Sequence, residues 1–231
     1  MWWDRFKRRQ ASAWLGERRL AWTGPGAEGV RVAATEGVAD SLAQLKSWHQ
    51  AAGRPALELV LEGGLCRLRA MTPVPGAQGF AEIQAVLNAA AQGQSDRQLL
   101  DHGLEGPVWW FLELAPELRA SLHAALGGKL VSLRPWWWGH MNLHEGCHAA
   151  FDGRTLSYCW AGQGAEAPLA GEIGPLADLD AAQRWLQRQK LGTERGPIRL
   201  VWLDWAGSAT QASVAAAENF PFKDWLREAV I

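Results

Sequence analysis

The sequence predicts an α/β protein with mixed sheets and flanking helices. Between residues 54 and 160, strand-like runs alternate with apolar stripes at helical spacing. Two residue pairs, Gly63-Gly64 and Asp152-Gly153, each separate two strand-like runs, as the short turns of hairpins do. The order from the first pair to the second is hairpin, helix, strand, helix, strand, hairpin. Helices that fall between strands in this way indicate the α/β class.

Length and composition are those of an ordinary globular protein. The chain has 231 residues, 48% of them hydrophobic, and a formal net charge of -1. It can therefore bury a sizeable core, and it has no basic excess that would favour nucleic acid as a partner. No apolar run reaches the length of a transmembrane helix, and no signal peptide precedes Asp4 and Arg5. Three cysteines without a CxxC spacing indicate a reduced protein, which we expect in the cytoplasm.

Tryptophan is unusually frequent, with fifteen residues against one tyrosine. Adjacent tryptophans occur at residues 2–3, 109–110 and 136–138. Neighbours on a strand point to opposite faces, so these indoles cannot all enter one core. Core packing is the simpler interpretation, and an aromatic surface for a partner is the alternative.

The first fifth of the chain predicts three short strands and a helix. Residues 12–15 and 20–22 are joined by Gly16-Glu17-Arg18-Arg19, and residues 30–34 alternate apolar side chains. A helical stripe then runs from Val38 to Trp48 and ends at Gly53.

Residues 57–70 predict a hairpin that turns at Gly63-Gly64. This register puts leucines and Cys66 on one face and mostly charged side chains on the other. Because a slip by one residue would mix the two sets, the turn and the register support each other.

The middle of the chain predicts helix, strand, helix and strand. The first helix stripe runs from Phe80 to Ala90, and residues 108–114 form a nearly all-apolar run, typical of a strand covered on both faces. A second stripe over 118–126 precedes a strand over 129–133. These lengths predict a right-handed crossover that joins a parallel pair of strands. After Pro135 we expect a short helical segment toward Asn142.

The Asp152-Gly153 pair predicts the second hairpin, with Cys147 facing inward and His148 outward. Residues 162–175 are rich in Gly, Ala and Pro and predict a loop. The expected organisation is therefore a core over residues 1–161, with two sheet lobes, and a C-terminal lobe over 162–231 that is closely packed on the core. That lobe is expected to hold a helix near 179–186, a strand over 198–205 and a terminal helix that begins near Asn219.

The N-terminal segment places aromatic residues beside a basic cluster. As a helix it would set Trp2, Trp3 and Phe6 on one side and Lys7, Arg8 and Arg9 near its end. That arrangement suits a weak contact with an anionic membrane surface or with a partner. A terminus whose aromatic side chains pack on the domain explains the same residues equally well.

His144-Glu145-Gly146-Cys147-His148 spells HExxH, the helical zinc motif of metallopeptidases. That chemistry needs both imidazoles on one helix face, with the glutamate as general base and a third ligand such as Glu166 or Glu172. The predicted strand from Cys147 argues against it, because strand geometry would separate His144 and His148 by roughly 13 Å. A small zinc peptidase is therefore the alternative hypothesis, and we expect no bound metal or cofactor.

The order of elements resembles the actin-like domain of pilus and secretion assembly proteins, namely the PilM family and the GspL cytoplasmic domain. The similar segments are residues 3–9, 56–73, 80–91, 108–142 and 147–164. The resemblance implies a reduced actin-like, ribonuclease-H-like fold, with an actin-like core over residues 1–161 and a shortened C-terminal lobe over 162–231. It also implies two phosphate turns in the members that bind ATP.

The chain departs from the family at both phosphate turns. The first reads Gly16-Glu17-Arg18-Arg19, without Asp and with a carboxylate where phosphate would lie, and the second is shortened to Asp152-Gly153. A two-residue turn is too short to surround a phosphate with backbone N–H groups. No catalytic residue of the family can be carried over.

These observations predict a non-enzymatic cytoplasmic scaffold of a type IV pilus or type II secretion-like assembly machinery. Its expected partner is a protein of the inner membrane, with weak peripheral membrane contact and no nucleic acid. Beside the zinc peptidase, the other alternative is a divergent actin-like protein that still binds ATP.

Overall fold

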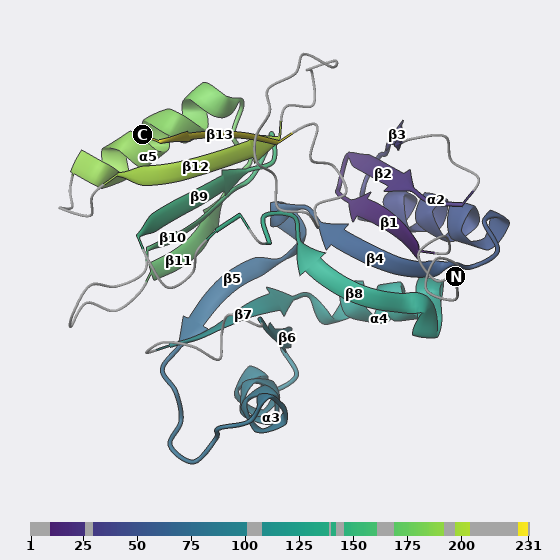
Figure 1. Ribbon diagram of the computed structural model, residues 1–231, viewed down its shortest axis with the longest axis horizontal. Coiled ribbons are helices and arrows are strands. Elements are labelled where there is room, and N and C mark those ends of the chain that lie inside the picture. The colour runs from purple at the N-terminus through teal and green to yellow at the C-terminus, as the bar shows by residue number, and fades with distance from the viewer. Residues whose placement is uncertain are drawn as a thin grey trace, which may run out of the picture. The chain divides into compact units, whose positions relative to one another are not determined.

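The structure is a computed structural model that describes residues 10–25, 30–100, 108–138, 140–141, 146–160, 169–191, 197–203 and 226–230. The chain forms two compact units, and it passes between them more than once. The first unit comprises Met1–Leu65 and Pro116–Trp136, and the second comprises the remaining residues, 66–115 and 137–231. Figure 1 labels the helices and strands of both units.

The first unit contains a five-stranded mixed sheet. In spatial order its strands are β3 (Arg31–Ala34), β2 (Arg19–Thr23), β1 (Gln10–Leu15), β4 (Ala56–Leu61) and β8 (Leu130–Pro135). The first three strands pair antiparallel, whereas β4 lies parallel to both β1 and β8. The predicted strands at the start of the chain are thereby confirmed.

Two helices accompany this sheet, α2 (Val38–Ala51) and α4 (Pro116–Leu126), and they pack against each other. α2 also packs on β1 and β2, where the rings of Trp22 and Trp48 lie 5.9 Å apart. Alternate β-strand residues and the helical stripes supply the core, which explains both sequence patterns. Its fully buried leucines include Leu15, Leu20, Leu45, Leu57, Leu59, Leu61 and Leu122.

The predicted hairpin over residues 57–70 is wrong. β4 ends at Leu61, the short 3-10 turn η1 (Gly63–Leu65) follows, and β5 (Arg67–Met71) belongs to a different sheet. Both edges of β4 are already occupied by parallel neighbours, β1 and β8, so no edge remains for β5. The separation of apolar from charged side chains was real, but it did not identify the partner strand.

The predicted crossover between the strands over 108–114 and 129–133 is also wrong, because these two strands belong to different sheets. β7 (Trp109–Leu114), α4 and β8 follow one another in sequence, yet β7 pairs with β5 and β6 while the parallel partner of β8 is β4. Beyond Pro135, residues 136–138 form a turn in place of the expected start of a helix.

The second unit contains a three-stranded antiparallel sheet in the order β5, β7 and β6 (Asp96–Leu99). Helix α3 (Phe80–Ala91) covers one face, where Ile83 and Leu87 pack against Trp109 and Phe111. The edge strand β6 was not predicted, because its sequence, DRQL, lacks an alternating apolar pattern. The Gln84 side chain stabilises this edge: its Oε1 accepts from Leu99 N at 2.9 Å, and its Nε2 donates to Arg97 O.

The second unit also contains a five-stranded sheet. In spatial order its strands are β11 (Leu169–Ile173), β10 (Leu156–Trp160), β9 (Cys147–Phe151), β12 (Ile198–Leu203) and β13 (Leu226–Val230). Only β9 and β12 pair in parallel. The predicted helix near 179–186 is confirmed as α5 (Leu179–Leu191), whose Ala182 and Leu186 enter the core with Cys147, Ala149, Phe151 and Leu200.

The hairpin of β9 and β10 is confirmed, but its loop is centred one residue later than predicted. Phe151 faces Leu156, and Asp152 N donates to Thr155 O at 3.2 Å. The pairing differs from the prediction by two residues, so the assignment of side chains to the two faces still holds.

Two C-terminal expectations are wrong. The predicted loop over 162–175 contains the strand β11, and residues 226–230 form the strand β13 in place of a terminal helix. Each strand adds to an edge of the same sheet, so backbone pairing with β10 and β12 outweighs the local signals. The strands β11, β12 and β13, which follow residue 161 in the sequence, belong to the same sheet as β9 and β10.

Candidate functional site: two self-capped turns

The turn between β1 and β2 has its backbone oxygens bound by side chains of the same unit. Gly16 N donates to Arg19 O at 3.0 Å and closes the turn. The buried Ser41 hydroxyl donates to Gly16 O at 2.7 Å, and the Thr35 hydroxyl donates to Glu17 O at 3.1 Å. The two hydroxyl oxygens lie 2.8 Å apart, so Ser41 and Thr35 act as one polar pair beneath the turn.

The outward backbone donor of this turn, Glu17 N, donates to a carboxylate. Its acceptor is Glu62 Oε2 at 2.6 Å, from a residue 45 positions along the chain. Glu62 follows β4 directly, and its own N–H donates to Leu15 O at 2.9 Å, which continues the pairing of β4 with β1. Glu62 is only 9% exposed, so the strand pairing places its carboxylate in a covered position over the turn.

The space over Gly16 shows how closely this carboxylate approaches. A Cβ at Gly16 would lie 2.9 Å from Glu62 Oε2 and 3.0 Å from Trp14 Nε1. The first contact is shorter than a Cβ atom tolerates and the second is tight, so an alanine at this position would force the Glu62 carboxylate to move. The Trp14 indole is itself packed on Trp136, at 6.0 Å between ring centroids.

The loop between β9 and β10 is capped in the same manner by its own aspartate. Asp152 Oδ1 accepts from Arg154 N at 2.9 Å and from Thr155 N at 2.7 Å, and Asp152 is only 3% exposed. Leu176 N donates to Arg154 O at 2.7 Å, so the outer side of the loop is bound as well. Gly153, with φ +96°, supplies the left-handed residue that this tight loop needs.

The Glu17 amide of the first turn and the Arg154 and Thr155 amides of the second therefore donate to carboxylates of the protein. A backbone N–H that already donates to an anion within hydrogen-bonding distance is not available to a phosphate oxygen. A phosphate would also have to approach a fixed negative charge, which is unfavourable at short range. The chemistry of these turns is that of structural caps.

Comparison with known proteins found similarity in fold to solved structures. No protein-family model matches the chain, and no curated protein matches its sequence. The cytoplasmic domain of EpsL, an inner membrane component of the type II secretion system of Vibrio cholerae, aligns with a TM-score of 0.50 and 14% identity, over 91% of this chain and 86% of that one. The chain has a GspL-like fold. A Bacteroides thetaiotaomicron protein described as having an actin-like ATPase fold aligns over 83% of this chain and 80% of that one, at TM-score 0.49 and 10% identity.

The predicted fold class, actin-like α/β with mixed sheets and flanking helices, is confirmed. In this GspL-like fold the sequence pointed to Glu17 as the carboxylate at the first turn. In the structure the carboxylate at this turn belongs to Glu62. Glu62 is not part of the turn in sequence, so it was not predicted from the sequence. A signal existed in principle, because Glu62 is a charged residue that directly follows a buried strand.

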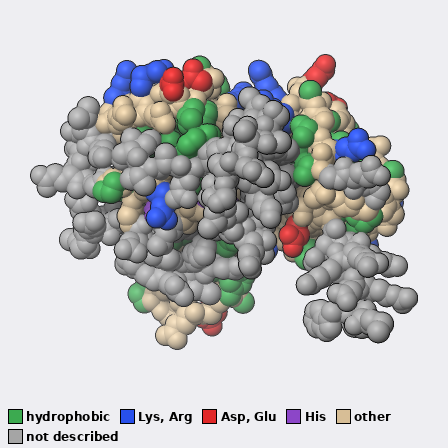
Figure 2. Space-filling view, turned by 45° about the horizontal axis from the view of Figure 1, so that its top comes forward, with side chains coloured by type: hydrophobic (Ala, Val, Ile, Leu, Met, Phe, Trp, Pro, Cys, Tyr) green, Lys and Arg blue, Asp and Glu red, His purple; other side chains and the backbone are tan. Residues whose placement is uncertain are grey.

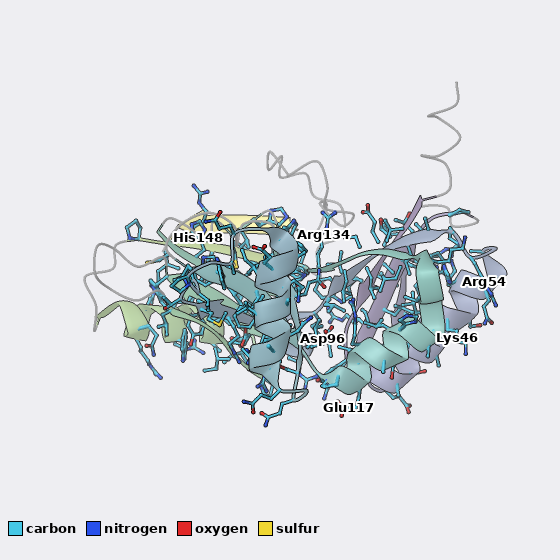
Figure 3. All side chains as sticks on the ribbon, turned by 90° about the horizontal axis from the view of Figure 1, so that it is seen from below. Lys46, Arg54, Asp96, Glu117, Arg134 and His148 are labelled. Atoms are coloured by element: carbon cyan, nitrogen blue, oxygen red, sulfur yellow. The ribbon has the colours of Figure 1, made fainter. Side chains whose placement is uncertain are left out.

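The HExxH residues do not form a continuous helix where the structure describes them. Gly146 has φ +73°, and β9 begins at Cys147, so His148 lies in a strand (Figure 3). His148 was expected to point outward. It does lie on the face opposite Cys147, but both faces of β9 are covered and it is only 8% exposed. His144 and Glu145 lie outside the described residues.

Glu172, considered as a third zinc ligand, is engaged elsewhere. Its carboxylate accepts from Leu68 N of β5 and pairs with Arg69 Nη1 at 3.1 Å. Within the described part of the chain no three His, Cys, Asp or Glu side chains converge on a possible metal position. The segment with Trp2, Trp3, Phe6, Lys7, Arg8 and Arg9 lies outside the described residues.

Glu172 belongs to a charge network within the second unit. Arg69 also approaches Glu113 at 3.6 Å, and Glu113 pairs with Arg97 at 3.2 Å. Burial raises the pKa of Glu172 above its usual value, while the Leu68 amide, Arg69 and Arg67 act in the opposite direction. Burial and the Glu172 charge also raise the pKa of Tyr158. The network therefore contains a carboxylate whose charged form is disfavoured by its surroundings.

We expect Glu172→Gln to leave the free energy of unfolding at neutral pH unchanged within about 1 kcal/mol, or to increase it. The amide oxygen still accepts from Leu68 N, and Arg69 keeps Glu113 as a partner. Because the folded pKa is raised, the wild-type carboxyl binds its proton more tightly when folded, and its contribution to stability grows as pH falls through that pKa. Denaturant unfolding should therefore show that the stability of Glu172→Gln relative to the wild type decreases from pH 7 to pH 4. A strongly destabilised variant at pH 7 would contradict this.

Proposed function

We propose that this chain is a non-enzymatic scaffold of a type IV pilus or type II secretion-like assembly machinery. It acts in the cytoplasm and binds a protein of the inner membrane. The similarity in fold to the EpsL cytoplasmic domain motivates the choice of machinery. Fold similarity alone does not determine function, so the proposal depends on the chemistry of the two turns.

The observation that carries the proposal is that three turn amides, those of Glu17, Arg154 and Thr155, donate to carboxylates of the protein. An external phosphate would have to displace a tethered carboxylate, which competes at a high effective concentration. The cost is larger still for a carboxylate held in place by strand pairing, as Glu62 is. We infer that the protein has no ATPase activity and transmits no nucleotide-dependent change.

The surface agrees with a protein partner better than with nucleic acid. On the face drawn in Figure 2, the described Lys and Arg side chains form small separate groups, with Asp and Glu nearby. A nucleic-acid surface would need a continuous basic stripe. No helix in the described part of the chain is long and apolar enough to span a bilayer. We propose that a partner protein makes the contact with the membrane, aided by the N-terminal segment.

Affinity purification of the tagged protein from its native cell, followed by mass spectrometry, tests the proposal. We expect inner-membrane components of a pilus or secretion assembly to co-purify, and the yield to be the same with and without Mg-ATP. Stoichiometric zinc that is lost when both His144 and His148 are replaced by Ala would favour the peptidase instead. Loss of the partners on nucleotide depletion would favour the ATP-binding alternative.

Deletion of residues 1–9 should reduce co-sedimentation with anionic vesicles and leave the melting temperature almost unchanged. Each basic residue near an anionic surface contributes about 1 kcal/mol, and salt screens this term. A matched variant with Lys7, Arg8 and Arg9 all replaced by Gln separates the electrostatic part from the aromatic part. If the deletion unfolds the protein, Trp2, Trp3 and Phe6 are core residues and the membrane contact is refuted.

A further inference from the structure

Glu62 has an unusual position for a side chain that only terminates a strand. Its carboxylate is buried, and it accepts from the amide of a turn 45 residues earlier in the chain. Burying a carboxylate is costly unless donors compensate for the lost hydration, so this contact has to be strong. The 2.6 Å separation between Glu17 N and Glu62 Oε2 is that of a charge-assisted hydrogen bond.

The surroundings of the carboxylate are built independently of its charge. The backbone of Glu62 is fixed at both ends, because its N–H donates to Leu15 O at 2.9 Å and its C=O accepts from Leu65 N at 3.0 Å. The turn beneath is fixed by Ser41 and Thr35. Gly16 and the Trp14 indole border the same small space. Trp14 Nε1 lies 3.0 Å from the position that a Cβ on Gly16 would take. Removal of the Glu62 side chain would therefore leave a space that the Glu17 amide borders, in a frame that still holds its shape.

We propose that the Glu62 carboxylate is an internal ligand of the β1–β2 turn, and that the turn is a small-carboxylate binding site occupied in cis. The wild-type protein keeps the site filled, so it needs no external anion to order this region. This inference deepens the proposed function. It rests on that function at one point, the assumption that the wild-type turn binds no external ligand. The chemistry predicts that a free carboxylate of matching size can replace the side chain.

Chemical rescue of Glu62→Ala tests this directly. The substitution removes one methylene and the carboxylate, and acetate supplies a methyl group and a carboxylate in their place. We expect the variant to melt roughly 3–12 °C below the wild type, because a charged acceptor of a buried amide is lost. Sodium acetate should then raise its melting temperature along a saturating curve, and sodium chloride at equal ionic strength should not.

Glu58→Ala is the matched control, since Glu58 lies on the same strand, is half-buried, and precedes the site. Acetate should leave Glu58→Ala and the wild type unchanged. Formate, which lacks the methyl group, should rescue less than acetate, and inorganic phosphate should rescue least because it is larger and tetrahedral, whereas the group it would replace is a planar carboxylate. Phosphate that rescues better than acetate would contradict a carboxylate site and indicate a latent phosphate site.

A second variant keeps the proposal testable if Glu62→Ala does not fold. Glu62→Gln retains an oxygen acceptor but not the charge, so the Glu17 amide proton should move upfield in the NMR spectrum by more than the other amides of the first unit. A Glu17 amide shift equal to that of the wild type, or an absence of acetate rescue in folded Glu62→Ala, would overturn the inference. Calorimetry with Mg-ATP on the wild type tests the scaffold proposal separately, because the rescue experiment measures the response of Glu62→Ala to acetate and not the binding of nucleotide.

Discussion

An Asp152→Ala protein is expected to unfold with a free energy about 2–4 kcal/mol below that of the wild type. The substitution leaves the amides of Arg154 and Thr155 without their acceptor, in a loop where Asp152 and Thr155 are both buried. A buried donor that loses a charged acceptor costs part or all of the desolvation of that group, and here the buried Thr155 amide and the part-buried Arg154 amide both lose one. Denaturant unfolding measures the effect, and hydrogen exchange at the two amides locates it.

Two matched variants define what this result means. Asp152→Asn keeps an oxygen at the same place and should lose about 1 kcal/mol or less. Asp178→Ala removes a comparable cap, the acceptor of Ala181 N at 2.7 Å, from the exposed start of α5 and should cost about 1 kcal/mol. If Asp152→Ala is no less stable than Asp178→Ala, the cap in the buried loop contributes no more to the free energy of unfolding than an exposed helix cap does.

Gly171→Ala is expected to cost about 1–3 kcal/mol, with the upper end most consistent with its surroundings. A Cβ at Gly171 would lie 2.6 Å from the Tyr158 hydroxyl oxygen and 2.9 Å from Tyr158 Cζ. Gly171 and Tyr158 face each other across β11 and β10, and the hydroxyl end of the Tyr158 ring lies over the glycine. The ring cannot move aside easily, because Trp160 and Trp185 each lie 4.9 Å from it between centroids.

A double-mutant cycle isolates this contact. In a Tyr158→Ala background the ring is gone, and the further change Gly171→Ala should cost almost nothing. Gly128→Ala is the neutral control, because a Cβ there meets no atom within 4 Å. Equal costs for Gly171→Ala in both backgrounds would show that the strain arises elsewhere.

Local patterns predicted the helices and the faces of the strands well. The stripes of α2, α3, α4 and α5 could be read from apolar spacing, because burial of one helix face imposes a 3.6-residue period. The β9–β10 hairpin followed from Asp152-Gly153 and from alternation, and its faces were correct although its register was two residues off. The helical spacing and the turn with its flanking alternation both depend on residues that are close together in the sequence. Such local patterns can be read directly from the sequence.

Partnership between strands could not be read in the same way. A strand such as β4 presents two equivalent backbone edges. Its side chains do not indicate that β1 and β8, and not β5, pair with these edges. The strands β6 and β11 are short, polar or Gly-containing edge strands, which lack the apolar alternation used to recognise strands. β13 was assigned to a helix because local capping signals cannot report an open edge on β12.

The candidate site shows the same division. The sequence indicated that both turns depart from a phosphate-binding form, since Gly16-Glu17-Arg18-Arg19 and Asp152-Gly153 are visible without a structure. The role of Asp152 as a cap is local, and an Asx-type turn could have been predicted. The role of Glu62 could not, because it depends on the parallel pairing of β1 with β4 across 45 residues.

Isothermal titration calorimetry of the wild-type protein with Mg-ATP tests the central claim most directly. With Glu17 N held by Glu62 and with Arg154 N and Thr155 N held by Asp152, we expect no heat of binding above that of dilution. The same outcome is expected with Mg-ADP, whose phosphates need the same amides. Saturable binding of Mg-ATP with a micromolar Kd would contradict the account, because it would require both carboxylates to yield their amides to phosphate.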